Sequence, residues 1–152
     1  MSLKLKGGCV HHDNGLLGAA SLDRAEMRKI ELLKANGYNA VRCAHNPPAE
    51  AFLRACDEQG MLVIDEAFDH WQKEKNPQDY LRFFDEWNEK DISAMVLRDR
   101  NHPSVIMWSI GNEIQERSDD AGVEIAERLR NIVKKLDPSR PVTAAINDYW
   151  DN

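Results

Sequence analysis

The chain has 152 residues, which is enough for one domain of ordinary size. Hydrophobic residues make up 42% and charged residues 30%, a composition typical of a globular protein. The net charge is −6 and the basic residues are scattered, which argues against the concentrated basic face that binds nucleic acid. No apolar run approaches the ~20 residues of a membrane span. We therefore expect neither nucleic acid nor a membrane as a partner, and the composition leaves the cellular compartment open.

Short apolar runs alternate with segments of helical periodicity along the chain. Asp23 and Glu26 have the spacing of a capping box, and Gly37 is placed to end the helix that follows. Gly60 ends a second helix, and the apolar run Met61–Ile64 has the length of a strand buried on both faces. In chain order the sequence predicts a strand at 4–10, a helix from 21 or 23 to 36, a strand at 38–43, a helix at 49–59, a strand at 61–64, a helix at 79–100, a strand at 104–110, a helix at 119–136 and a strand at 142–146.

Strands that alternate with helices predict an α/β fold with a parallel sheet. No glycine-rich phosphate-binding motif follows the first strand, which disfavours an open nucleotide-binding sheet. Polar residues instead stand where successive strands end: His11, Arg42 with His45, Asp65 with Glu66, and Asn112 with Glu113. In a (β/α)8 barrel, or TIM barrel, these ends converge on one catalytic mouth. A complete barrel takes about 250 residues, so we predict that residues 1–152 are a partial TIM barrel of about the first four to five βα units.

Glu113 is the leading candidate for a catalytic group. It follows an apolar strand that contains Trp108, and we expect desolvation there to raise its pKa toward the range of a general acid. Cleavage of a glycosidic bond needs such an acid together with a second carboxylate. Asn112 beside it is suited to hydrogen-bond a sugar hydroxyl. The competing interpretation is that Glu113 pairs with an arginine such as Arg42 or caps the next helix, and spacing alone does not decide between the two.

Four segments in order resemble glycoside hydrolase family 2, which contains β-galactosidases, β-glucuronidases and β-mannosidases. The segment RDRNHPSVIMWSIGNE at 98–113 is similar to the acid/base signature of that family. The segments NAVRCAH at 39–45, and CDEQG at 56–60 with VIDEA at 63–67, resemble its second-strand and third-strand motifs. Lys6, Gly7 and Gly8 with His11 resemble the start of its barrel. These matches cover the chain almost from end to end.

The resemblance implies a retaining β-glycosidase, close to a β-galactosidase, that hydrolyses O-glycosidic bonds of a carbohydrate substrate. It implies that Glu113 is the general acid/base and that Asn112 contacts the sugar 2-hydroxyl. It places His11 and His45 in the sugar subsite and Arg42 near the nucleophile. That nucleophile comes from a later strand in the family, and no stretch after residue 142 resembles its motif. We therefore expect the 152-residue chain alone to lack turnover.

Two departures from the β-galactosidases bear on metal and specificity. Those enzymes have Arg-His-Glu where this chain has Val10-His11-His12. They also have Asn-Ile-Glu-Thr-His after the third strand, where a glutamate and a histidine help to hold magnesium. This chain has Phe68-Asp69-His70-Trp71-Gln72 there, so the two ligands are missing. We therefore expect no cofactor, and strict galactose specificity does not follow from the resemblance.

Two other classes of function remain as alternatives. The run His11-His12-Asp13 suggests a metal site and hence a metal-dependent barrel hydrolase. Neighbouring residues on a strand point to opposite sides, however, so both histidines cannot face the pocket without a turn. A non-catalytic carbohydrate-binding or scaffold piece is the other. Asp65 and Glu66 are expected to be structural, with one of them bonding Arg42 or a neighbouring loop, rather than to form an inverting pair with Glu113.

Several further side chains carry smaller expectations. His102 precedes its strand, at the end of the barrel away from catalysis, and is expected to be structural. Trp71 and Trp150 are candidate sugar-stacking platforms, and Trp87 is expected in the core. The cysteines lack CxxC spacing and are expected to be buried apolar residues: Cys9, Cys43 and Cys56. An incomplete barrel leaves unpaired edge strands, so we also expect self-association through those edges.

Overall fold

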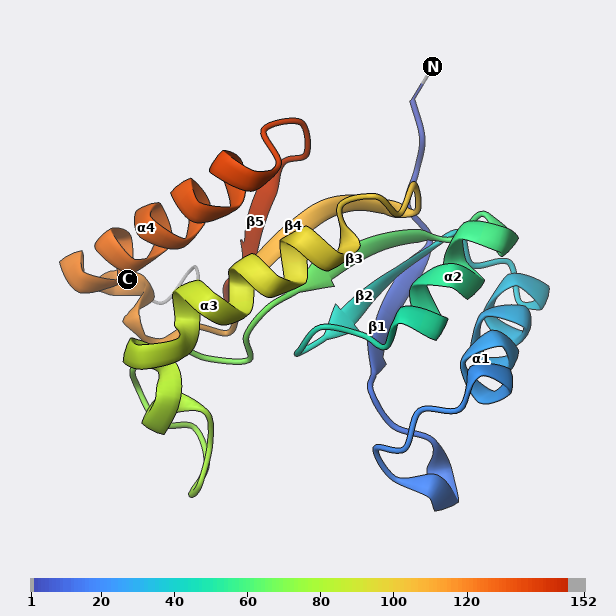
Figure 1. The fold of residues 1–152 in the computed structure, drawn as a ribbon, viewed down its shortest axis with the longest axis horizontal. Helices are drawn as coiled ribbons and strands as arrows, with labels where there is room; N and C mark the ends of the chain where they lie inside the picture. The colour runs from blue at the N-terminus through green and yellow to red at the C-terminus, as the bar shows by residue number, and fades with distance from the viewer. Residues whose placement is uncertain (1, 148–152) are drawn as a thin grey trace.

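A computed structural model describes residues 2–147 of the chain. Its five strands form one sheet in which every neighbouring pair is parallel and the spatial order equals the chain order. This order is the one that a TIM barrel requires, and it confirms the predicted α/β partial barrel (Figure 1). The strands are β1 (Gly7–His11), β2 (Ala40–Ala44), β3 (Leu62–Glu66), β4 (Val105–Asn112) and β5 (Val142–Ala145).

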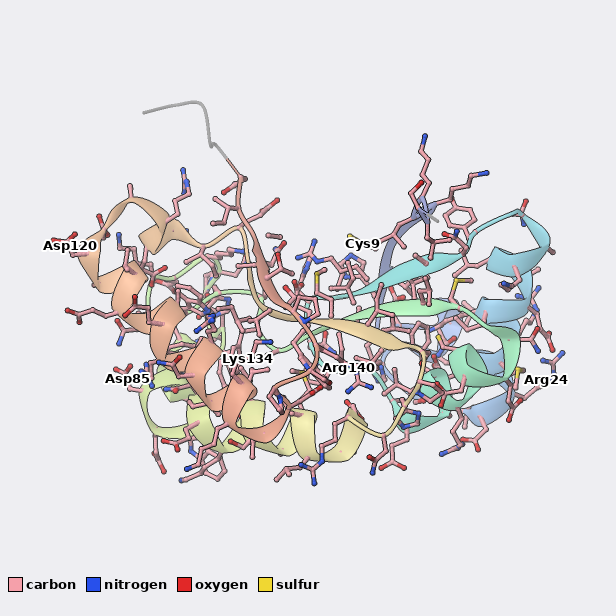
Figure 2. All side chains as sticks on the ribbon, turned by 90° about the horizontal axis from the view of Figure 1, so that it is seen from above. Cys9, Arg24, Asp85, Asp120, Lys134 and Arg140 are labelled. Atoms are coloured by element: carbon pink, nitrogen blue, oxygen red, sulfur yellow. The ribbon has the colours of Figure 1, made fainter. Side chains whose placement is uncertain are left out.

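Four α-helices connect these strands and lie along one side of the sheet (Figures 1 and 2). They are α1 (Asp23–Ala35), α2 (Glu50–Gln59), α3 (Leu81–Asp99) and α4 (Asp120–Leu136), with short 3-10 turns at Gly15–Leu17 and Gln115–Ser118. All four lie within the ranges predicted from the sequence. Within residues 2–147, no helix has the length and apolarity needed to cross a lipid bilayer.

Glycines end the first two helices as predicted. Gly37 has φ 83° and Gly60 has φ 63°, a left-handed conformation that glycine adopts without steric cost. The predicted capping box of α1 does not form, because the helix begins at Asp23 and its N-cap makes no side-chain hydrogen bond. Glu26 is buried instead, and it accepts a hydrogen bond from Asn14 and pairs with Lys29.

The apolar core lies between the sheet and the helices. Its largest fully buried members come from both layers: Trp108, Phe84, Ile30, Leu53, Met61, Ile92 and Leu129. The opposite face of the sheet is not covered in this chain. A hollow of about 290 Å3 opens there, and it is lined by Leu5, Gly7, Gly8, Cys9, Ala40, Val41, Arg42 and Ile64.

Two core expectations are wrong. Cys9 is exposed because β1 is an edge strand of the uncovered face, whereas Cys43 and Cys56 are buried as expected. Trp87 is 41% exposed, and the ammonium of Lys90 lies 4.2 Å from the centre of its ring. Trp87 therefore lies on the solvent side of α3.

Candidate active site

Because β1, β2, β3 and β4 run parallel, their carboxyl ends lie together at one end of the sheet. We call this end the mouth. The rings of His11 and His45 contact each other edge to face, with centroids 5.1 Å apart. Arg42 and His45 both bond Glu66, and Arg42 also bonds Asn112. The structure therefore brings together the polar residues that the sequence placed at these strand ends, except for Asp65 and for the second histidine, His12.

Glu66 is the centre of this cluster and is fully buried. Arg42 donates from Nε to Oε2 at 2.9 Å and from Nη2 to Oε1 at 2.8 Å, which is the geometry of a charge-assisted forked pair. His45 Nδ1 lies 2.8 Å from Oε1, and the hydroxyl of Ser109 donates to Oε2 at 2.5 Å. The expectation that one of the two acids bonds Arg42 is thus confirmed. All of these contacts make Glu66 a structural carboxylate that orients its neighbours.

Asn112 is held on both sides of its side-chain amide. Arg42 Nη2 donates to Oδ1 at 2.8 Å, and Nδ2 donates to Asp69 Oδ1 at 2.9 Å. Asn112 is buried, at 5% exposure, while the side chains of its partners Arg42 and Asp69 are 20% and 39% exposed. The amide therefore has a fixed orientation at the mouth, next to Glu113.

Glu113 differs from its neighbours because its side chain is exposed. Its backbone N–H donates to Ala145 O of β5 at 2.7 Å, and its φ is 45°. Arg42 pairs with Glu66 instead, and the N-cap of α4 is Asp119, so neither competing role of Glu113 is present. Among residues 2–147 its carboxylate has no hydrogen-bond or ion-pair partner. Residues 2–147 do not form the expected desolvated pocket around Glu113, whose side chain is exposed although Asn112 and Ile114 on either side of it are buried.

Two residues of the β3–α3 loop complete the mouth, and the sequence did not single them out. Asp69 bonds Asn112, and the Lys75 ammonium bonds both Asp69 Oδ1, at 3.0 Å, and the Asn112 carbonyl oxygen, at 2.7 Å. Burial raises the pKa of Asp69, but the hydrogen bonds from Asn112 and Lys75 outweigh it and leave that pKa lowered. Asp69 carried a weak signal, since it is a carboxylate soon after a strand end. Lys75 carried none.

The remaining candidates are placed elsewhere. Asp65 lies on the helix side of the sheet, fully buried near Asp99, and not at the mouth. Trp71 is buried and donates to Ile110 O at 2.8 Å, so it is a core residue and the stacking role is wrong. Trp150 lies outside the described residues. His102 bonds Asp57 at 2.6 Å before β4 begins, which is the structural position expected.

No group of three or more His, Cys, Asp or Glu side chains within residues 2–147 is arranged to hold a metal ion. The alternative of a metal-dependent hydrolase therefore has no ligand set in this part of the chain. A cavity of about 520 Å3 borders the mouth at His45 and Asp69 and extends toward α3. Its other polar groups are engaged, since Tyr80 bonds Asp91 and Arg98 bonds Asp99.

Relatives and solved structures cover this chain almost completely. The β-galactosidase BoGH2A of Bacteroides ovatus is 44% identical over 95% of this chain and 21% of its own length. A glycosyl hydrolase family 2 member from Bacteroides cellulosilyticus is 60% identical, with a TM-score of 0.96, over 99% of this chain and 19% of its own. A family 2 β-galacturonidase from Eisenbergiella tayi is 33% identical, with a TM-score of 0.82, over 97% and 26%. The chain thus spans about a fifth to a quarter of the length of these proteins.

The family match also covers nearly the whole chain. Residues 2–152 match the family described as glycosyl hydrolases family 2, TIM barrel domain. The sheet order, the polar mouth and the ordered motifs agree with this match. The chain therefore belongs to glycoside hydrolase family 2 and forms part of the TIM barrel domain of that family.

Proposed function

We propose that this chain supplies the acid/base half of a retaining β-glycosidase site that hydrolyses O-glycosidic bonds in a carbohydrate. The observation that carries the proposal is Glu113, whose exposed carboxyl has no partner among residues 2–147, whereas Glu66 and Asp69 at the same mouth are engaged. In the first step its acid form protonates the departing glycosidic oxygen. In the second step its carboxylate removes a proton from the attacking water.

The residues around Glu113 are proposed to bind and orient the sugar. Asn112, whose amide is fixed by Arg42 and Asp69, is proposed to bond the sugar 2-hydroxyl, and His11 with His45 is proposed to line the same subsite. Arg42 already bonds Glu66, Asn112 and, at 3.6 Å, the Cys9 sulfur. Its proposed part in substrate binding is therefore to keep Asn112 in place rather than to reach the sugar.

The nucleophile is proposed to lie outside these 152 residues. Glu66 is buried and saturated with donors, and Asp69 is paired with Lys75. A nucleophilic carboxylate has to attack the anomeric carbon, and in retaining enzymes it lies about 5–5.5 Å from the acid/base carboxyl. Neither acid is free to do so. The 152-residue chain alone is thus expected to show no turnover of an aryl β-glycoside.

No cofactor is proposed. The magnesium of related β-galactosidases requires free oxygen or nitrogen ligands after the third strand. Here Asp69 and the Asn112 carbonyl already bind the ammonium of Lys75, and His70 Nε2 accepts from Leu81 N at 3.1 Å. The ammonium of Lys75 already occupies the point between these oxygens, and its positive charge would repel a divalent cation there. A chelator is expected to leave hydrolysis by the full-length protein unchanged, and loss of activity restored by magnesium would contradict this.

The substrate is proposed to be a β-galactoside or a close analogue. BoGH2A is named a β-galactosidase, and the protein from Eisenbergiella tayi is named a β-galacturonidase. A panel of aryl β-galactoside, β-galacturonide and β-glucuronide on the full-length protein separates these sugars. If sugar binds by calorimetry but none of the panel is hydrolysed, the non-catalytic alternative is favoured.

The central test is Glu113→Gln in the full-length protein. Loss of general acid/base catalysis is expected to lower kcat about 10²–10⁴-fold for a substrate with a poor leaving group. Added azide is expected to restore turnover of an activated substrate and to form a glycosyl azide of retained configuration. Glu124→Gln, an exposed glutamate on α4, is the matched control. Wild-type rates in Glu113→Gln would refute the proposal.

A further inference from the structure

Lys75 lies in the loop between β3 and α3, yet its side chain reaches into the mouth. Its ammonium donates to three oxygens: Asn112 O at 2.7 Å, Asp69 O at 2.7 Å and Asp69 Oδ1 at 3.0 Å. An ammonium has three N–H donors, so all of them are used. Only 15% of the side chain is exposed. The backbone N–H of Lys75 is itself fixed by Asp79 Oδ2 at 2.9 Å.

The oxygen that Lys75 binds belongs to the peptide that carries Glu113. That peptide joins Asn112 to Glu113, and its N–H donates to Ala145 O of β5 at 2.7 Å. The peptide is thus held from both sides, by the β3–α3 loop at its carbonyl and by β5 at its N–H. Its plane fixes the direction in which the Glu113 side chain leaves the backbone.

The conformation of Glu113 requires such support. Its φ of 45° lies in the left-handed region, which residues with a Cβ adopt at a cost and keep only where the surroundings hold them. The Glu113 carboxylate has no partner among residues 2–147 that would hold it in place. The Lys75 and Ala145 bonds are therefore the contacts that fix where the carboxyl stands.

We propose that Lys75 is a positioning residue for the acid/base glutamate. It acts through the Asn112 carbonyl and touches neither the sugar nor the reacting atoms. Asp69 assists by keeping the ammonium in place and by bonding the Asn112 amide at the same time. This inference rests on the proposed glycosidase function.

The kinetic test uses Lys75→Met in the full-length protein with a series of aryl β-glycosides whose leaving groups differ in pKa. Poor leaving groups need the acid, and a misplacement of about 1 Å costs up to about 10²-fold. We expect kcat/KM to fall about 10–100-fold for an unactivated phenyl glycoside and to stay nearly unchanged for a dinitrophenyl glycoside. The dependence of rate on leaving-group pKa is therefore expected to steepen.

Lys73→Met is the matched control. Lys73 lies in the same loop, is half exposed, and pairs with Asp119 rather than with the mouth. It is expected to keep the wild-type leaving-group dependence. The positioning role would be overturned if kcat/KM of Lys75→Met fell equally for every leaving group, or if Lys75→Met and Lys73→Met behaved alike. Either result would leave the glycosidase function intact. Failure of the wild-type protein to hydrolyse any β-glycoside would instead overturn the function on which the role rests.

A structural measurement tests the same inference independently of turnover. In a crystal structure of the full-length Lys75→Met variant, the 112–113 peptide is expected to rotate and Glu113 to leave the left-handed region. An unchanged φ and carboxyl position would overturn the proposal whatever the kinetics show. Lys75→Arg is the second variant, for the case in which Lys75→Met is too unstable to study. It retains a cation with several donors, so its rate on poor leaving groups is expected to lie between those of wild type and Lys75→Met.

Discussion

At the scale of single residues, the mouth is organised by one buried carboxylate. Glu66 receives donors from Arg42 on β2, from His45 directly after β2 and from Ser109 on β4. Its charge is compensated because the Arg42 guanidinium is bidentate to it. A buried pair of this kind contributes little net stability, but breaking it leaves a charge without a partner.

Glu66→Gln is therefore expected to be strongly destabilising. The change removes the negative charge and leaves the guanidinium of Arg42, 20% exposed, facing a neutral amide. We expect the free energy of unfolding to fall by about 3 kcal/mol, measured by urea denaturation. Glu58→Gln, an exposed glutamate on α2, is the control and is expected to change it by less than about 0.5 kcal/mol. A loss no larger than in the control would show that Glu66 is not the organising charge.

Gly111, near the end of β4, is packed so closely that no side chain fits there. A Cβ at this position would lie 2.5 Å from Ile114 Cδ1 and 2.9 Å from the indole nitrogen of Trp71. Both neighbours are buried, and Trp71 is fixed by its bond to Ile110 O. The absence of a side chain at Gly111 thus lets the mouth close tightly just before Asn112.

At the scale of elements, the sequence predicted the strands and helices well because their signals are local. Glycine stops, apolar runs and helical periodicity lie within each segment, and the parallel order then brings the strand ends together. The errors have non-local causes. Cys9 is exposed because, within residues 2–147, β1 is an edge strand, and Lys75 reaches the mouth through a loop whose path no periodicity encodes. The exposure of Glu113 depends on how the chain turns after β4.

The contact between β3 and α3 contains a buried acid whose ionisation opposes folding. Burial, together with the nearby charge of Asp99, raises the pKa of Asp65 well above its usual value. Within residues 2–147, no well-aligned hydrogen bond reaches either carboxyl oxygen of Asp65, although the Asp99 carboxyl and the Glu66 backbone lie close by. Arg98 pairs with Asp99 at 2.6 Å and so leaves Asp65 without a cation of its own.

The sign of the pH dependence follows from this raised pKa. Asp65 stays protonated in the folded chain at pH values where it ionises in the unfolded chain. Its contribution to stability is therefore complete below an unfolded pKa of about 3.9, and it is lost as pH rises toward the folded pKa. Asp65→Asn removes this dependence. Relative to wild type, the free energy of unfolding of the variant is expected to rise with pH, by at most about 1.4 kcal/mol per pH unit.

Urea unfolding of both proteins between pH 4 and 8 measures this difference. Glu89→Gln, an exposed glutamate on α3, is the control and is expected to show a difference from wild type that does not change with pH. If Asp65→Asn behaves like that control, Asp65 is not protonated in the folded chain at neutral pH.

At the scale of the whole molecule, this chain presents a sheet with two unpaired edges. In residues 2–147, β1 pairs only with β2 and β5 only with β4, so each has one row of free backbone donors and acceptors. The face opposite the helices carries a hollow of about 290 Å3. Free edges of this kind favour pairing with another chain. We therefore propose that the 152-residue chain by itself self-associates through β1 or β5.

Sedimentation velocity of the chain at several concentrations tests this, with a shift from monomer to dimer expected as concentration rises. Gly8→Lys is the diagnostic variant, because a Cβ at Gly8 meets no atom within 4 Å and the lysine places a charge on the β1 edge. It is expected to move the equilibrium toward monomer if β1 is the contact. Lys90→Glu changes an exposed lysine on α3, the helix that joins the inner strands β3 and β4, so it alters charge away from both edge strands and is expected to leave association unchanged. A wild-type chain that stays monomeric at every concentration would show that the free edges do not pair. The twist of the five-stranded sheet would then be what keeps a second edge from aligning with it.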